Sequence, residues 1–238
     1  MDLLTYDIFF ALLTLTFLEI VLGIDNLIFI AIAVQKLPKA QRKKARIFGL
    51  SLALIIRILM LLGLTWVMGL TKPLFYIGDA GFSFKNILLI IGGLFLIIKG
   101  GWEIANEVLF GLNHEEPVST KKEISKGMFA AIVQISIVDF IFSFDSIITA
   151  VGMTNNVPVI VTAIIISMIV MLIASESLTR ILKDYPSLKV VALAFIFMVG
   201  VILFADGIHL HISKGYLYFS LFFTMTVEIL NIIARKNK

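Results

Sequence analysis

Seven long apolar segments divide this chain, and they leave few folds open to it. We place them at residues 8–34, 48–69, 86–102, 127–152, 157–176, 188–206 and 216–234. A helix needs about 20 apolar residues to cross a bilayer. Inside the bilayer a backbone must satisfy its own hydrogen bonds, which a helix does. The sequence therefore predicts an all-α polytopic membrane protein, with a single transmembrane domain over residues 1–238.

The composition agrees with this prediction and excludes several classes of protein. Hydrophobic residues make up 60% of the 238 positions, and the mean hydropathy is +1.04. Asp2 and Asp7 precede the first segment, which lacks an A-x-A cleavage site, so we interpret it as a retained span and not a signal peptide. The absence of cysteine excludes disulfides and thiolate metal sites. No nucleic-acid motif is present, and we expect no organic cofactor.

The placement of basic residues predicts the orientation of the chain in the membrane. Fifteen Lys and Arg residues lie in the first, third and fifth connections and the C-terminal tail, or at the span ends beside them. The other side has three, Lys72, Lys85 and Lys214. Basic residues favour the cytoplasmic side of a membrane. The N-terminus is therefore predicted outside and the C-terminus in the cytoplasm.

Two stretches of the chain repeat one pattern of carboxylates inside apolar spans. Residues 19–28 read E-I-V-L-G-I-D-N-L-I, and residues 139–148 read D-F-I-F-S-F-D-S-I-I. The copies start 120 positions apart (139 minus 19) and three spans apart, so they have opposite orientations in the membrane. A weaker echo relates residues 93–100 to residues 200–207. These features predict an inverted repeat of residues 8–105 and 127–207, with one additional helix at 216–234.

The repeated carboxylates require compensation. A charge at the centre of a membrane helix costs about 2.5–3.5 kcal/mol, so four of them would cost roughly 10 kcal/mol. The donors of the two motifs are all oxygen and come from Glu19, Asp25, Asn26, Asp139, Asp145 and Ser146. Oxygen donors suit hard cations such as Mn²⁺, Ca²⁺ and Mg²⁺. A divalent ion would also leave room for a coupled proton, so the motifs predict a site for a bound or transported cation.

Helical geometry leaves two arrangements open. Positions i, i+4 and i+7 share one face of a helix. This groups Glu19 with Gly23 and Asn26, and Asp139 with Ser143 and Ser146. Asp25 and Asp145 would point about 120° away. Either the helices are broken near Gly23 and Ser143, which we favour, or the second carboxylates face a third helix.

Several other polar residues lie within or beside the spans. Arg57 needs a carboxylate partner because a guanidinium stays protonated. It either occupies the cation site when no cation is bound or forms a fixed structural ion pair. Secondary candidates are Ser143, Gln134 as a cavity-lining or interhelical residue, and Asp206 as a guard of an outer opening. We expect His114, His209 and His211 to be solvated loop residues, and Glu176 and Lys99 to be snorkelling or solvated.

Both motifs resemble the TerC family of integral membrane proteins. Its marks are E-[IV]-V-L-G-x-D-N-[LI]-[IV] in the first span and D-x-x-F-[SA]-x-D-S-[IV] later, and residues 19–28 and 139–147 match them. The resemblance covers essentially the whole chain and is strongest to the short, single-module YgdQ-like branch. Longer relatives carry cytoplasmic CBS domains, which we do not expect in a chain that stops at Lys238.

This resemblance implies a multi-span protein of the bacterial inner membrane and of the cation-exporter type. Members are linked to tellurium resistance, manganese efflux, calcium handling and the supply of metal to secreted enzymes. Carried over, the metal-binding residues would be Glu19, Asp25, Asn26, Asp139, Asp145 and Ser146. The expected substrate is Mn²⁺, with Ca²⁺ as the alternative, in exchange for protons. Tellurite is an oxyanion that acidic residues would repel, so any tellurium phenotype is expected to be indirect.

Other functions are weighed against the exporter. A membrane partner that supplies metal to exported enzymes would need the same site, so the sequence does not separate the two. An intramembrane aspartyl protease is disfavoured because its YD and GxGD signatures are missing, and we expect no enzyme. A retinal protein is disfavoured because the last span has no lysine in its middle. Expected partners are the lipid bilayer and a divalent cation, with a homodimer left open and nucleic acid excluded.

Overall fold

The computed structural model describes most of the chain. It covers residues 2–35, 37–63, 69, 71–78, 80–109, 121–154 and 156–236. Within these ranges the side chains at 2–5, 7, 77, 109, 121–126, 145 and 235–236 are not described. The helices are α1 (Asp2–Leu22), α2 (Ile24–Gln35), α3 (Lys39–Leu62), α5 (Phe84–Leu109), α6 (Lys121–Met153), α7 (Val157–Asp184), α8 (Pro186–Gly207) and α9 (Lys214–Lys236). Two strands, β1 (Pro73–Ile77) and β2 (Ala80–Ser83), complete the described elements.

The membrane-spanning helices confirm the predicted all-α class. Among the described residues, six helices are long and apolar enough to cross a membrane. The pair α1 and α2, bent by 45°, makes a seventh if it counts as one span. Each predicted span overlaps one of these, but the boundaries differ. The helix expected to begin at 48 starts at Lys39, because the basic stretch before the apolar run continues the same helix.

An antiparallel β-hairpin lies where the sequence predicted only a connection. Strands β1 and β2 pair Tyr76 with Gly81 and Ile77 with Ala80. Gly78 has a φ of 62°, a left-handed conformation that glycine adopts without a steric penalty. Prediction missed the strands because the segment is short and its alternation of residue types is weak.

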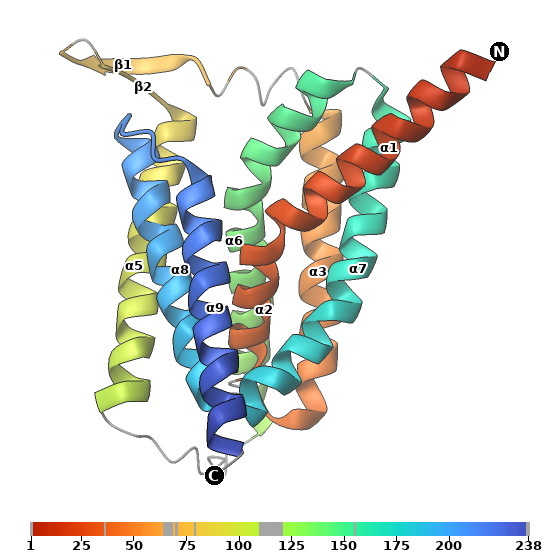
Figure 1. Ribbon diagram of the computed structural model, residues 1–238. Coiled ribbons are helices and arrows are strands. Elements are labelled where there is room, and N and C mark those ends of the chain that lie inside the picture. Colours follow the sequence, from red (N-terminus) through yellow and green to blue (C-terminus); the bar gives the residue numbers. More distant parts are fainter. Residues whose placement is uncertain are drawn as a thin grey trace. The chain divides into compact units, whose positions relative to one another are not determined.

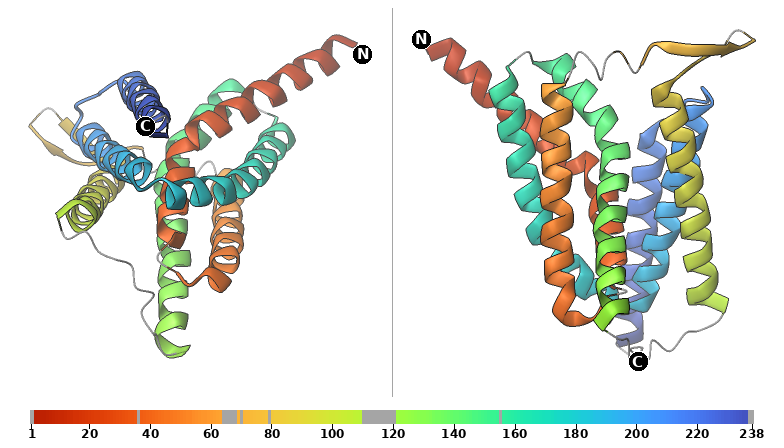
Figure 2. Two further views of the ribbon diagram at one scale, coloured as in Figure 1. Left: turned by 60° about the horizontal axis from the view of Figure 1, so that its bottom comes forward. Right: turned by 180° about the vertical axis from the view of Figure 1, so that it is seen from behind.

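Two compact units make up the molecule, and each draws on both halves of the chain. The first contains residues 1–70 and 118–179, which hold α1, α2, α3, α6 and most of α7. Within it, α3 and α6 run side by side (Figures 1 and 2). Helix α2 supplies much of the core, since Ile28 to Val34 are all buried.

The second unit contains residues 71–117 and 180–238, with the hairpin, α5, α8 and α9. Helices α5 and α8 pack along most of their length in both views (Figures 1 and 2). A Cβ added at Gly93 would lie 2.5 Å from the backbone nitrogen of Phe204, and one at Gly200 would lie 2.9 Å from the Gly93 carbonyl oxygen. The backbones therefore touch where glycine removes the side chain.

The α5–α8 contact has the form that an inverted repeat would produce. Gly93 meets its own repeat partner, Gly200, which is 107 positions later (200 minus 93). Gly100 packs on Phe197 and Gly207 on Ile90, and these two contacts exchange under the same shift of 107 (207 minus 100, 197 minus 90). A two-fold axis relating α5 to α8 would produce such reciprocal pairing, and the inverted repeat stays a prediction.

Candidate functional site: a buried arginine between two carboxylates

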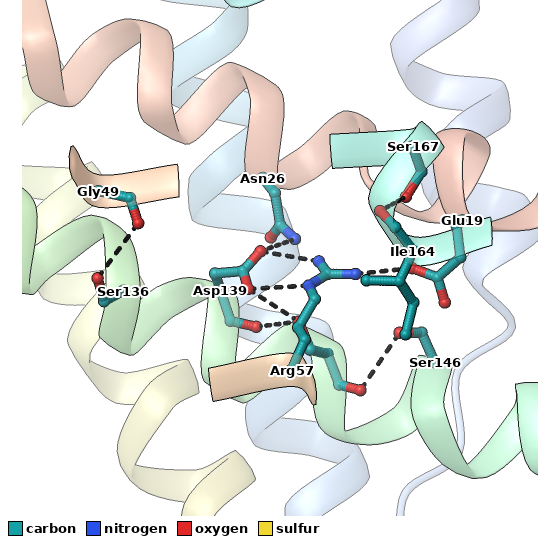
Figure 3. Close-up of polar contacts among 10 residues, drawn as sticks. Glu19, Asn26, Gly49, Arg57, Ser136, Asp139, Ser146, Ile164 and Ser167 are labelled. Atoms are coloured by element: carbon teal, nitrogen blue, oxygen red, sulfur yellow. Dashed lines mark hydrogen bonds and ion pairs between the residues drawn. The ribbon is translucent and has the colours of Figure 1, made fainter. Parts of the chain in front are cut away.

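Arg57 on α3 lies between carboxylates from two other helices of the first unit (Figure 3). Its Nη1 donates to Glu19 Oε2 at 2.7 Å, from α1. Its Nη2 and Nε donate to Asp139 Oδ1 and Oδ2 at 2.8 and 3.0 Å, from α6. The Arg57 residue is 2% exposed, and paired forks of this kind are among the strong hydrogen bonds of proteins. One guanidinium thus joins the first carboxylates of both motif copies.

Neutral side chains complete the surroundings of Asp139. Asn26 donates from Nδ2 to Asp139 Oδ1 at 3.0 Å, and Ser143 donates to Oδ2 at 3.1 Å. With the two bonds from Arg57, Oδ1 of Asp139 accepts two hydrogen bonds, and Oδ2 accepts one from Arg57 and a share of the Ser143 hydroxyl hydrogen, which also faces the Asp139 carbonyl. The amide nitrogen of Asn26 is thus hydrogen-bonded, but its amide oxygen is not. This buried Oδ1 accepts no hydrogen bond within the part of the chain that the structure describes.

A bend at Gly23 brings Glu19 and Asn26 to the same cluster. The N–H of Gly23 donates to the Ile20 carbonyl, one residue closer than in an α-helix, and α2 begins at the next residue. A Cβ at Gly23 would lie 2.7 Å from Met171 Sδ and 2.9 Å from the Glu19 carbonyl oxygen. A side chain at this position would need Met171 to move and would press on the Glu19 carbonyl oxygen. The predicted break at Gly23 is confirmed.

The predicted break at Ser143 is wrong, because α6 runs without interruption from Lys121 to Met153. The Ser143 hydroxyl faces the carbonyl of Asp139, one turn earlier, at 2.5 Å and its carboxylate at 3.1 Å, and its one hydrogen is shared between them. A serine can bond in this way without breaking the helix. The two copies of the motif therefore have different backbones around similar side chains.

The remaining predicted metal-binding residues have varied surroundings. Asp25 is buried in the first turn of α2, where the helix dipole favours a negative charge. Ser146 is buried, but its hydroxyl donates to the Ser143 carbonyl at 3.2 Å. Asp145 lies on α6, and its side chain is outside the described residues. Among the side chains that are described, no three acidic or histidine residues gather closely enough to hold a metal ion.

The secondary candidates do not join the cluster. Gln134 is half-buried on α6, five residues before Asp139 and so more than one helical turn away. Asp206 belongs to the second unit, where its Oδ1 lies 3.6 Å from Nδ1 of His211. His209 and His211 are exposed, as expected, and His114 lies outside the described residues.

A second polar group in the first unit was missed by the sequence analysis. Arg46 is buried and donates to Glu176 at 2.7 Å, although that carboxylate side chain is 55% exposed and was expected to be solvated or snorkelling. Arg42 donates to the carbonyls of Gln35 and Leu37, both at 2.8 Å. The spacing of positions 46, 49, 53 and 57 could have revealed it, because residues at this spacing share one face of a helix. In the structure that face of α3 is buried, and it holds Arg46 three turns from Arg57.

Comparisons with known proteins agree with the membrane architecture. A UPF0053 protein of Haemophilus influenzae is 44% identical over 226 residues, which are 95% of this chain and 94% of its own length. The UPF0053 inner membrane protein YgdQ of Escherichia coli K12 is 43% identical over 226 residues, 95% of this chain and 93% of its length.

A longer relative shares the same region. The UPF0053 inner membrane protein YoaE of Escherichia coli K12 is 46% identical over 231 residues, 97% of this chain but 44% of its own length. No solved structure matches the chain. The pattern of the integral membrane protein TerC family matches residues 4–238. This membrane-spanning chain therefore belongs to the TerC family of integral membrane proteins.

Proposed function

We propose that the protein exports divalent metal cations across the bacterial inner membrane. Mn²⁺ is the first candidate and Ca²⁺ the alternative, with protons moving in exchange. The observation that supports this is the position of Arg57: the matched acids Glu19 and Asp139, from opposite copies of the motif, hold one cation between them. We propose no enzymatic activity.

The charge of the cluster favours a dication. Glu19 and Asp139 carry two negative charges against one on Arg57, which leaves a formal charge of −1. A dication in place of the guanidinium would bring the same two carboxylates to zero. Buried charges are costly unless they are paired. A divalent ion therefore matches these acids better than a monovalent one does.

The donor atoms favour a hard ion. The cluster offers the carboxylates of Glu19 and Asp139 and the amide oxygen of Asn26, with Asp25 buried next to it in sequence. Oxygen sets of this kind suit Mn²⁺, Ca²⁺ and Mg²⁺, whereas zinc and copper favour nitrogen and sulfur. Family membership and the relatives named inner membrane proteins are consistent with a transporter.

The proposal is tested by measuring manganese in cells that lack their own exporters. Wild type, Glu19→Gln and Asp139→Asn are expressed to equal levels, with Glu107→Gln as the control. Glu107 is matched because it is also an ion-paired carboxylate, bonded to Lys189 in the other compact unit. Wild type and the control should lower intracellular Mn²⁺, and the two cluster variants should not.

Two outcomes would contradict the proposal. Equal Mn²⁺ and Ca²⁺ contents in cells with wild type and with an empty vector would exclude export of either ion. Export by wild type in cells but not by purified protein in vesicles would instead favour the metal-supply partner. A C-terminal reporter tests the orientation, and it should report the cytoplasm.

A further inference from the structure

We infer that Arg57 is a tethered competitor for the transported dication: its guanidinium fills the cation position in this structure, and the ion binds only when the guanidinium withdraws. The inference rests on the proposed function and assigns the means by which the same site is emptied and refilled. The alternative is an ion pair that stays closed throughout.

The hydrogen bonds of Asp139 leave little room for a metal ion in this state. A carboxylate has about four lone-pair positions. In Asp139 three are used, two by Arg57 and one by Asn26, and the single hydroxyl hydrogen of Ser143 is shared between Oδ2 and the Asp139 carbonyl. A metal ion can therefore bind both oxygens of Asp139 only after a donor leaves. Arg57 is the donor whose departure frees a position on both oxygens at once.

The second carboxylate leads to the same conclusion. Arg57 holds Glu19 through Nη1 at 2.7 Å while it holds Asp139 through its other two nitrogens. A dication among these oxygens would stand next to a buried positive charge, where repulsion is poorly screened. Guanidinium and dication therefore exclude each other by both position and charge.

Asn26 provides an independent sign that the cluster is built for a ligand other than arginine. The residue is 2% exposed, and its Oδ1 accepts no hydrogen bond from the described residues, although its Nδ2 is bonded to Asp139. A buried acceptor without a partner is unfavourable. Arg57 does not satisfy this oxygen where it lies. A metal ion drawn to Asp139 would give the oxygen a partner, since amide oxygens are ordinary ligands of hard cations.

This arrangement has a functional consequence. When the ion leaves, Arg57 returns and the two carboxylates are never without a cation. The transporter can then return to its starting conformation with Arg57, and not the substrate ion, between the carboxylates. If the arginine is replaced by a neutral residue, the ion should bind more tightly, and the protein should exchange one ion for another but fail to carry out net export.

Binding is the first arm of the test. Full-length wild type, Arg57→Met and Arg46→Met are purified in detergent at pH 8, and free Mn²⁺ is followed by electron paramagnetic resonance. Arg46→Met is the matched control because it removes the other buried, ion-paired arginine of α3. If the arginine-filled state makes up about 90% of the wild type, Arg57→Met should bind Mn²⁺ roughly tenfold more tightly. The control should bind as wild type does.

Transport is the second arm. Vesicles containing each protein are assayed for net Mn²⁺ movement and for exchange of labelled against unlabelled Mn²⁺. Arg57→Met should retain exchange and lose net movement, whereas Arg46→Met should retain both. Arg57→Lys should be intermediate in affinity, because a lysine keeps the charge but cannot form the paired fork. It also replaces Arg57→Met if size-exclusion chromatography shows that the methionine variant does not fold.

The outcomes separate the two proposals. If wild type neither binds nor moves Mn²⁺ or Ca²⁺, the proposed function fails. If wild type transports but the Arg57 variants bind no more tightly, or lose exchange together with net movement while folded, Arg57 is a fixed structural pair. Net transport by Arg57→Met at the wild-type rate would also overturn the inference.

Discussion

The two compact units join their helices by opposite means. In the first unit, α1, α3 and α6 meet at a buried network of charges around Arg57. In the second, α5 and α8 meet backbone to backbone at Gly93 and Gly200. A polar network can exchange one partner for another, whereas close apolar packing has a single well-fitted arrangement. By this argument, a substitution in the first unit can leave a charge without a partner, whereas one in the second unit mainly disturbs packing.

The largest expected effect comes from removing the central charge of the first unit. Arg57→Met should lower the free energy of unfolding by about 3–5 kcal/mol without metal, because it strands two buried carboxylates. Adding Glu19→Gln and Asp139→Asn should recover most of that loss, since no charge of the cluster then remains buried. Unfolding in detergent measures the free energy of unfolding of the single variant and of the triple variant. A triple variant as unstable as Arg57→Met would show that shape rather than charge holds this unit.

The next largest loss of stability is expected from a substitution at the α5–α8 contact of the second unit. In Gly93→Ala the new Cβ would lie 2.5 Å from the Phe204 nitrogen and 2.7 Å from the Gly200 carbonyl oxygen, and neither backbone atom can rotate away. Overpacking of this kind costs about 1–3 kcal/mol. Gly152→Ala is the control, because a Cβ there meets nothing within 4 Å. Equal stability of the two variants would contradict the close contact.

Gly23 connects the bend of the first unit to the site and should affect function more than stability. Its new Cβ would meet the flexible Met171 side chain, which can move, and the Glu19 carbonyl oxygen, which cannot. We expect Gly23→Ala to cost about 1–2 kcal/mol. It should also reduce manganese export strongly, because Glu19 and Asn26 would no longer converge. Normal export in the cell assay would show that the bend is dispensable.

The smallest effect is expected at Arg46 and Glu176. More than half of the Glu176 side chain is exposed, so solvent screens the pair despite its 2.7 Å separation. A double-mutant cycle with Arg46→Met and Glu176→Gln should give a coupling of about 0–1 kcal/mol. A coupling energy of about 3–5 kcal/mol, the size of the loss expected for Arg57→Met, would show that the partly exposed pair is as strong as the buried network.

Prediction from the sequence was most successful where local patterns decide the structure. Each of the seven apolar runs became a helix or, for the first, a bent pair. The i, i+4 spacing correctly placed Asp139 near Ser143 on the unbroken helix α6, whereas Glu19 and Asn26 reach one cluster across the bend at Gly23. It also required a carboxylate partner for Arg57, which has two.

The same reasoning failed where two similar sequences had to be distinguished. Gly23 and Ser143 occupy matching positions, and a break was predicted at both. The first is bent at Gly23, whose N–H bonds to the Ile20 carbonyl, and the second stays helical, with its hydroxyl bonded back to Asp139. Neither outcome follows from the local pattern of apolar residues.

The sequence by itself determined that this chain crosses a membrane several times and buries acids in matched positions, because hydrophobic length and helical period are local properties. Only the tertiary structure decided which cation those acids hold. Asn26 and Asp139 are 113 positions apart, and Arg57 and Asp139 are 82 apart. Contacts over such separations depend on how helices pack, and packing placed a guanidinium of the chain itself between them.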